Sequence, residues 1–135
     1  MTGKPIFVAL CFALAACAQG GKGPGAPEDP PLRLAESDAG RAIDLERGKR
    51  VTLRLEANHS TGHRWSMSAG GDGALERIGE PFYTVERSVP GGGGAEYWTF
   101  RGVRSGKQEL RFEYRRPWER EKPPVKVLSY TVEVR

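Results

Sequence analysis

The chain has 135 residues, a formal net charge of +4 and 28% charged residues, with basic and acidic side chains interspersed along the sequence. This length suits one domain with a single apolar core. The interspersed charges exclude a basic stripe for nucleic acid, so no partner of that class is expected. The sequence places no nucleophile beside a base and contains no phosphate-binding loop, so it indicates neither an enzyme nor a bound cofactor.

Residues 1–16 predict a secretory signal. Lys4 provides a short basic start, and the apolar run from Ile6 to Ala16 is too short to span a bilayer as a mature helix. The segment Leu14-Ala15-Ala16-Cys17 resembles a bacterial lipobox, in which cleavage precedes the cysteine and its thiol carries diacylglycerol. Cys17 would then be the only cysteine of the mature chain, because Cys11 leaves with the signal. An ordinary signal cut nearby, with Cys17 incidental, is the alternative.

Residues 17–31 predict a lipid-anchored flexible tether. They are rich in glycine and proline and lack bulky apolar side chains, so they cannot bury enough surface to offset the entropy lost on ordering. Residues 32–135 predict the folded domain, which we expect to be a monomer. The expected location is the bacterial cell envelope, where lipid on Cys17 holds the protein at a membrane, with the outer membrane or periplasmic face favoured over the inner membrane.

The folded part of the sequence predicts an all-β domain. Apolar and polar residues alternate clearly over 51–55, 110–114 and 128–134, as in strands with one buried face. No window of ten or more residues keeps a helical period. About seven short antiparallel strands indicate a β-sandwich, although the pattern alone does not distinguish it from a small barrel. Weaker strands are predicted at 41–45, 63–68, 83–89 and 96–103, and glycine-rich breaks at 70–73, 91–94 and 105–106.

Three short loops carry the residues that we expect to form a binding site. Each lies between predicted strands, and each is built from residue types that favour turns or end a strand. Any one of them alone would be an ordinary turn or hairpin tip. In chain order they read Asn58-His59-Ser60-Thr61-Gly62-His63-Arg64-Trp65, then Gly91-Gly92-Gly93-Gly94, then Arg116-Pro117-Trp118.

In the same order, these loops resemble the N-P-T-T-G-[FY]-x-W, G-x-G-G and R-P-W signatures of the chagasin-like inhibitors of papain-type cysteine proteases, inhibitor family I42. The resemblance covers residues 33–135 and implies an immunoglobulin-like β-sandwich that inhibits such a protease reversibly and without a covalent step. The first loop would enter the centre of the catalytic cleft, and the second would pair with the backbone of the protease. Trp118 would anchor the third loop on the far side of the cleft. The residues implied to contact the protease are Asn58, His59, Ser60, Thr61, Gly62, His63, Gly91, Gly92, Gly93, Gly94, Arg116, Pro117 and Trp118.

The first loop departs from the family signature at three positions. His59 replaces its proline, Ser60 its first threonine and His63 its aromatic residue. Loss of the proline predicts a freer loop, with a loss of preorganisation of ~0.4–1 kcal/mol. Because histidine gains a proton near neutral pH, we also expect His59 or His63 to weaken binding to a protease with a cationic catalytic histidine as the pH falls. The two histidines lack a carboxylate or cysteine to complete a ligand set, so no metal site is expected.

The three tryptophans are expected to divide between core and surface. Trp65 and Trp98 lie within strand patterns and predict core residues, whereas Trp118 predicts an exposed binding residue unless it folds back onto its own sandwich. The main alternative function is a binding module of another class, an envelope lipoprotein domain that uses the same loops for a non-protease partner.

Overall fold

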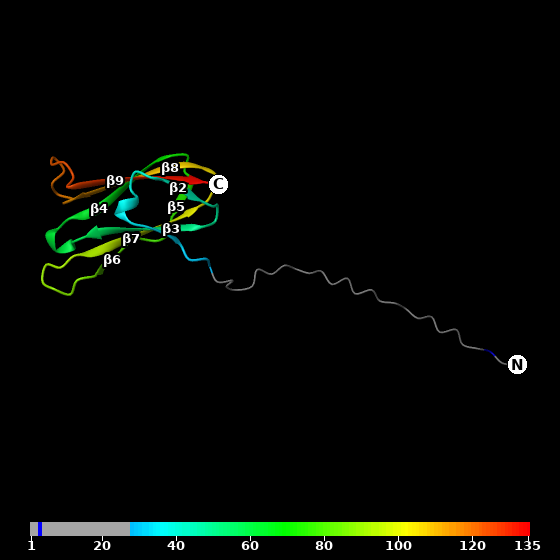
Figure 1. Ribbon diagram of the computed structural model, residues 1–135, viewed down its shortest axis with the longest axis horizontal. Coiled ribbons are helices and arrows are strands. Elements are labelled where there is room, and N and C mark those ends of the chain that lie inside the picture. The colour runs from blue at the N-terminus through cyan, green and yellow to red at the C-terminus, as the bar shows by residue number, and fades with distance from the viewer. Residues whose placement is uncertain (1–2, 4–27) are drawn as a thin grey trace.

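The computed structural model describes residue 3 and residues 28–135, so nearly all of the expected signal, Cys17 and most of the expected tether lie outside the described residues. The described chain forms two β-sheets that pack face to face (Figure 1). They contain nine strands, and two short 3-10 helices lie in the connections. Within this described part of the chain, neither helix is long or apolar enough to cross a bilayer.

The first sheet is centred on two long antiparallel strands. Its order is β1-β3-β7-β5, and β6 also pairs with β7. The register of β3 and β7 sets Leu53 opposite Trp98, so both side chains point into the sandwich. The strands are β1 (Leu32–Leu34), β3 (Arg50–Ala57), β5 (Leu75–Arg77), β6 (Phe82–Val85) and β7 (Gly94–Gly102).

The second sheet has the order β2-β9-β8-β4. A 3-10 helix, η1 (Glu36–Asp38), lies between β1 and β2 and so connects the two sheets. The Tyr130 hydroxyl, on a buried residue of β9, donates a hydrogen bond to the Ala35 carbonyl at 3.0 Å and ties this connection to the core. The strands are β2 (Ala42–Leu45), β4 (Arg64–Gly71), β8 (Gly106–Arg115) and β9 (Lys126–Val134).

The core lies between the sheets and follows the predicted alternation. Trp65 and Trp98 are each 5% exposed, as expected, and both pack edge-on against Phe112. Each large apolar side chain buried in this way stabilises the fold by about 1.5–3 kcal/mol. Tyr114 and Leu128, at the ends of two predicted strands, are only half-buried against this core. The other inward-facing residues of the three clearest predicted strands are buried: Val51, Leu53, Leu55, Leu110, Phe112, Tyr130, Val132 and Val134.

The β-sandwich is confirmed, but its strands differ in detail from the prediction. β1 and β5 were missed because three residues are too few to show an alternation. The edge strands β1 and β2 pair in parallel with β3 and β9, so the expectation of purely antiparallel pairing does not hold at these edges. β4 continues into the predicted break at 70–73, since Gly70 and Gly71 pair with β8 through backbone groups that need no side chain.

Candidate functional site

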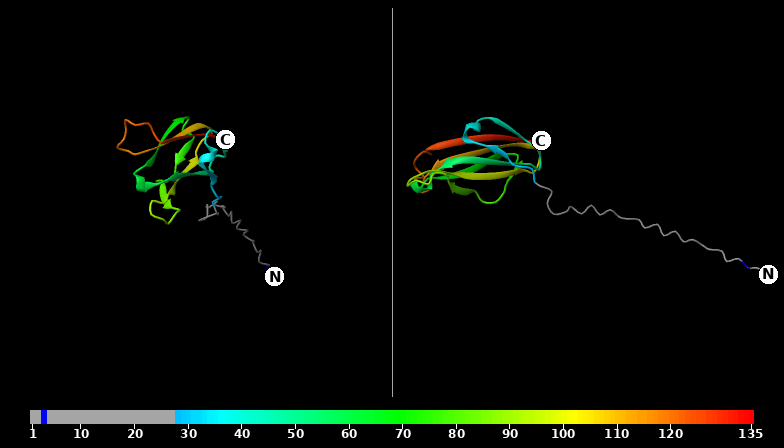
Figure 2. Two further views of the ribbon diagram at one scale, coloured as in Figure 1. Left: turned by 60° about the vertical axis from the view of Figure 1, so that its left-hand side comes forward. Right: turned by 60° about the horizontal axis from the view of Figure 1, so that its bottom comes forward.

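The three loops meet at one end of the sandwich. They connect β3 to β4, β6 to β7 and β8 to β9, and they lie away from the C-terminus in each view (Figure 1 and Figure 2). The Asn58 side-chain amide donates a hydrogen bond to the Gly91 carbonyl at 2.9 Å. The Arg116 guanidinium donates to the Thr61 carbonyl at 3.0 Å. The first loop is therefore tied directly to both of the others.

The first loop is a tight turn whose shape follows from its sequence. It contains the 3-10 helix η2 (His59–Thr61), which begins after Asn58 and ends at Gly62. Asn58 Oδ1 accepts hydrogen bonds from the Ser60 N–H at 3.1 Å and the Ser60 hydroxyl at 2.5 Å, as an N-cap asparagine does. Gly62 has a φ of +82°, a left-handed conformation that favours glycine. Ser60 and Thr61 remain exposed at the tip.

Tyr114, at the end of β8, supports the base of this turn. Its hydroxyl accepts a hydrogen bond from the Asn58 N–H at 2.8 Å, and its ring stacks with His63 at a centroid distance of 5.2 Å. His63 Nδ1 lies 2.8 Å from the Thr61 hydroxyl oxygen. The Arg64 guanidinium donates to the carbonyls of His59 and His63 at 3.1 and 2.8 Å. The loop is thus held by side chains at both of its ends.

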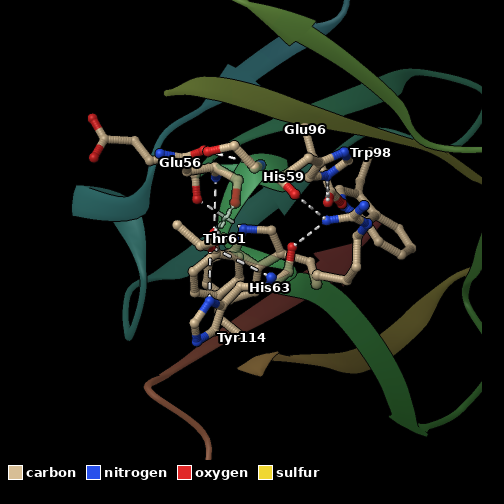
Figure 3. A network of polar contacts seen from close by, with 11 residues as sticks. Glu56, His59, Thr61, His63, Glu96, Trp98 and Tyr114 are labelled. Atoms are coloured by element: carbon tan, nitrogen blue, oxygen red, sulfur yellow. Dashed lines mark hydrogen bonds and ion pairs between the residues drawn. The ribbon is translucent and has the colours of Figure 1, made fainter. Parts of the chain in front are cut away.

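His59 points into the sandwich instead of outward. Its Nε2 lies 2.6 Å from Glu96 Oε1, and its ring stacks on Tyr83 at a centroid distance of 3.7 Å with an interplanar angle of 15°. Glu96 Oε2 accepts a hydrogen bond from Trp98 Nε1 at 3.2 Å, and Figure 3 shows this network. The expected extra freedom from losing the family's proline is therefore countered by side-chain contacts. The His59 ring therefore contacts Glu96 and Tyr83 of its own domain.

The third loop places Trp118 beside the first. Trp118 is 69% exposed, as expected, yet a Cβ built on Gly62 would overlap Trp118 Cη2 and lie 3.1 Å from its Cζ2. The indole therefore needs a glycine at position 62 to occupy this place. Glu119 holds the loop through a hydrogen bond from Lys122 Nζ at 2.9 Å and a 3.6 Å contact with Arg116 Nη1. The Lys122 ammonium holds the pKa of the Glu119 carboxyl below its usual value.

The four glycines of the second loop have two different roles. A Cβ on Gly92 or Gly94 would collide with the backbone carbonyl of Arg87 or Thr84, so these two glycines are required by the hairpin's own packing. A Cβ on Gly93 would make only an ordinary contact at 3.5 Å, and one on Gly91 would have no described atom within 4 Å. Packing within the hairpin therefore does not require glycine at positions 91 and 93.

Sequence reasoning missed Glu96, Tyr83 and Tyr114 as parts of the site. Glu96 had a visible signal, because it shares its alternating face in β7 with Trp98 and Phe100, and a carboxylate on a core face needs a partner. Its partner lies 37 residues away, which no local pattern reveals. Among the described residues, no group of three or more histidine, cysteine, aspartate or glutamate side chains could hold a metal ion.

Solved structures of similar fold include cysteine protease inhibitors. EhICP2 of Entamoeba histolytica, described as a cysteine protease inhibitor, superposes with a TM-score of 0.69 and 20% identity over 77% of this chain and 95% of that one. Amebosin superposes with a TM-score of 0.62 and 23% identity, over 78% of this chain and 99% of that one. A p53 epitope scaffold based on an inhibitor of cysteine proteases gives a TM-score of 0.53 with 21% identity, covering 69% of this chain and 91% of that one. At these identities the likeness establishes a shared fold.

Family membership rests on the sequence itself. No curated protein sequence matches the chain significantly. The sequence model of the chagasin family of peptidase inhibitors, I42, matches residues 44–134, which is well over half of the chain and includes all three loops. The chain therefore belongs to the chagasin family, whose members are peptidase inhibitors and not enzymes.

Proposed function

We propose that this protein inhibits papain-type cysteine proteases reversibly and without a covalent step, and that its three loops together fill the catalytic cleft. The observation that carries the proposal is the joining of the loops into one surface, through the hydrogen bonds Asn58–Gly91 and Arg116–Thr61 and through Trp118 on Gly62. A stable complex of this kind buries ~800 Å² on each partner. Membership of a peptidase inhibitor family supports the same function.

The first loop would block the cleft without being cut. A peptide that pairs with a groove as an added strand is extended, whereas residues 59–61 form a 3-10 turn. The turn is closed by a hydrogen bond from the Gly62 N–H to the His59 carbonyl at 3.1 Å, so opening it would break contacts within the domain. Thr61 and Gly62 at the tip would therefore occupy the catalytic centre in a shape that does not offer a scissile bond.

The other two loops would hold the complex on either side of this centre. The backbone at Gly91 and Gly93 suits main-chain pairing with the protease through its N–H groups, because the two carbonyls already accept hydrogen bonds within the domain and no side chain separates the two backbones. Trp118 and Arg116 supply the residue types that most often dominate interface energy. Trp118 is exposed before binding and already placed against Gly62, so little of its freedom remains to be lost.

A matched pair of variants in the β8–β9 loop tests this proposal. Trp118→Ala should weaken inhibition of papain by about 2 kcal/mol, roughly thirtyfold, because it removes the anchor. Val125→Ala removes an apolar side chain that is 71% exposed in the same loop and should leave inhibition unchanged. Both variants should melt close to the wild-type temperature. Equal inhibition by all three proteins would contradict the assignment of Trp118.

We also propose that residues 1–16 are a signal, that residues 17–31 form a tether and that Cys17 carries lipid at the bacterial envelope. Glu28 forms ion pairs with Arg50 and Arg101 at 2.9 and 3.6 Å, and Asp29 pairs with Lys49, so the chain enters the sandwich at the end opposite the loops. A membrane-held protein would thus present its loops away from the membrane. Cys17→Ser should move the protein from the membrane to the soluble fraction, and a wild-type chain without lipid by mass would refute the anchor.

A further inference from the structure

We propose that Glu96 is a positioning residue of the inhibitory surface. By holding His59, it fixes the first loop in the way that a proline fixes the corresponding loop in the family signature. This inference rests on the proposed function for its effect on inhibition, but the contact itself and its effect on the loop can be tested without a protease. Glu96 has no place among the residues expected to touch a partner, since it lies inside the sandwich and is 5% exposed.

His59 stands where its contact with Glu96 can fix the conformation of the first loop. His59 is the first residue of η2, directly after the Asn58 cap, so its backbone angles set the direction in which the turn leaves β3. A proline here would fix φ by its ring and is well tolerated at the first position of a helical turn. In this chain the imidazole is instead held by two contacts, which we call the His59 clamp. Its Nε2 lies 2.6 Å from Glu96 Oε1, and its ring stacks on the Tyr83 ring at a centroid distance of 3.7 Å.

Glu96 is equally dependent on His59. A buried carboxylate must be paired and hydrogen-bonded to be tolerated. Its oxygens are satisfied by His59 Nε2 and by Trp98 Nε1, and in the described part of the chain His59 is the one basic side chain within ion-pair distance. Two other charged side chains contact the partners of this pair. The Arg64 guanidinium donates to the His59 carbonyl, and the Arg77 guanidinium carbon lies 6.0 Å from the centroid of the Trp98 ring.

The His59 clamp is connected by hydrogen bonds and packing to the surface that would meet the protease. The His59 carbonyl accepts the Gly62 N–H, and Gly62 in turn carries the Trp118 indole. The Thr61 carbonyl accepts the hydrogen bond from Arg116. Releasing His59 would therefore loosen the tip of the first loop and its contacts with the third loop together. The chemistry at the tip would be unchanged, but its geometry would no longer be fixed before binding.

The test compares three variants with the wild-type protein, all made in the full chain. His59→Ala removes the clamp and leaves Glu96 with an unpaired buried charge. His59→Ala/Glu96→Leu removes the clamp and the unpaired charge together. His59→Pro/Glu96→Leu also lacks both groups, but its proline fixes the loop directly. The two double variants are a matched pair, because both remove the same acceptor from Trp98. Melting temperature, deuterium exchange of the loop amides and inhibition of papain are measured for each protein.

The three variants are expected to separate stability from positioning. His59→Ala should lower the melting temperature, speed exchange of the Thr61 and Gly62 amides and weaken inhibition roughly tenfold. His59→Ala/Glu96→Leu should regain most of the melting temperature but keep the fast exchange and the weak inhibition. His59→Pro/Glu96→Leu should regain slow exchange and inhibit within about threefold of wild type.

Two results would overturn the inference. One is that inhibition and slow exchange return in His59→Ala/Glu96→Leu together with the melting temperature. Glu96 would then affect the stability of the fold but not the position of the loop. The other is that the proline restores neither slow exchange nor inhibition. If the wild-type protein inhibits no papain-type protease, the proposed function fails, and the exchange of the loop amides still decides whether Glu96 positions the loop.

Discussion

At the residue scale, position 62 requires glycine for two separate reasons. Its φ of +82° disfavours any side chain, and the Trp118 ring occupies the space that a Cβ would take. Gly40 shares only the first requirement, since its φ is +80° and a Cβ added there would have no described atom within 4 Å. The two glycines therefore allow the backbone cost of a substitution to be measured apart from the loss of the Trp118 contact.

Gly62→Ala and Gly40→Ala should both destabilise the fold by about 1–2 kcal/mol, because both force alanine into a left-handed conformation. Only Gly62→Ala should displace Trp118, shift the tryptophan fluorescence and weaken inhibition. Thermal unfolding, fluorescence and papain inhibition measure these effects. If the two variants inhibit equally well, Trp118 does not need its place on Gly62.

The surroundings of the three tryptophans follow from the sequence, whereas those of His59 depend on tertiary contacts. The exposure of Trp118 and the burial of Trp65 and Trp98 could be predicted, since strand alternation and the position of Pro117 separate them. The inward orientation of His59 could not, because it depends on Glu96 and Tyr83, which reach the loop only after β6 and β7 have paired. A loop residue that differs from its family signature was expected to act on the partner, whereas here it contacts its own core.

At the scale of elements, the strands that could be predicted are those with one buried and one exposed face. β3, β8 and β9 alternate over their length because the sandwich buries every second side chain. β1 and β5 lack that signal, and the parallel pairing of β1 and β2 depends on how the chain passes between the sheets. The order of the three loops was visible in the sequence, but the hydrogen bonds that join them are tertiary contacts.

The β6–β7 hairpin offers a prediction at this scale. Gly94→Ala should destabilise the fold by about 1–3 kcal/mol, because its methyl group would collide with the Thr84 carbonyl across the strand pair. Gly93→Ala should melt like wild type, since its methyl group has room beside the Ala57 carbonyl at 3.5 Å. If the second loop pairs with the protease backbone, Gly93→Ala should nevertheless weaken inhibition. A Gly93→Ala protein that melts and inhibits like wild type would exclude backbone pairing at this position.

At the scale of the whole molecule, three carboxylates near the surface pair with basic side chains, and one of them, Glu86, links elements that are distant in sequence. Glu86, after β6, accepts hydrogen bonds from Arg54 of β3 and from Tyr97 of β7. The Arg54 guanidinium lowers the pKa of Glu86 from its ordinary value of 4.5. Arg111 lowers the pKa of Glu113 and Lys122 that of Glu119 in the same way. Because these pKa values are lower in the folded state, unfolding takes up protons in acid.

The sign of the acid response follows from this direction. The stabilisation from these carboxylates is fully present above the ordinary pKa of 4.5 and is lost as the pH falls through the lower folded values. The melting temperature should therefore fall between about pH 5 and pH 3, by a smaller amount in 0.5 M salt because the three ion pairs lie near the surface, where salt screens them. Glu86→Gln should show a smaller fall than wild type over that range. Parallel curves for the two proteins would show that Glu86 does not contribute.

The sandwich separates the three loops from the point where the chain enters it. The three loops gather at one end, and residues 28–31 and the C-terminus lie at the other. The sandwich between them is held by a continuous apolar core, so the loops rest on a rigid support. We propose that this end blocks a papain-type catalytic cleft, which can be tested directly on the folded wild-type protein.

The most direct test is an active-site titration of papain with the wild-type protein. We expect papain activity to fall linearly to a 1:1 equivalence point and to return on dilution, and residues 58–65 to remain uncut after prolonged incubation. Papain whose catalytic cysteine carries a bulky covalent inhibitor should fail to bind. A protein that keeps its folded circular dichroism signal but leaves papain and several other papain-type proteases fully active, or is cut rapidly within residues 58–65, would show that these loops do not inhibit such a protease.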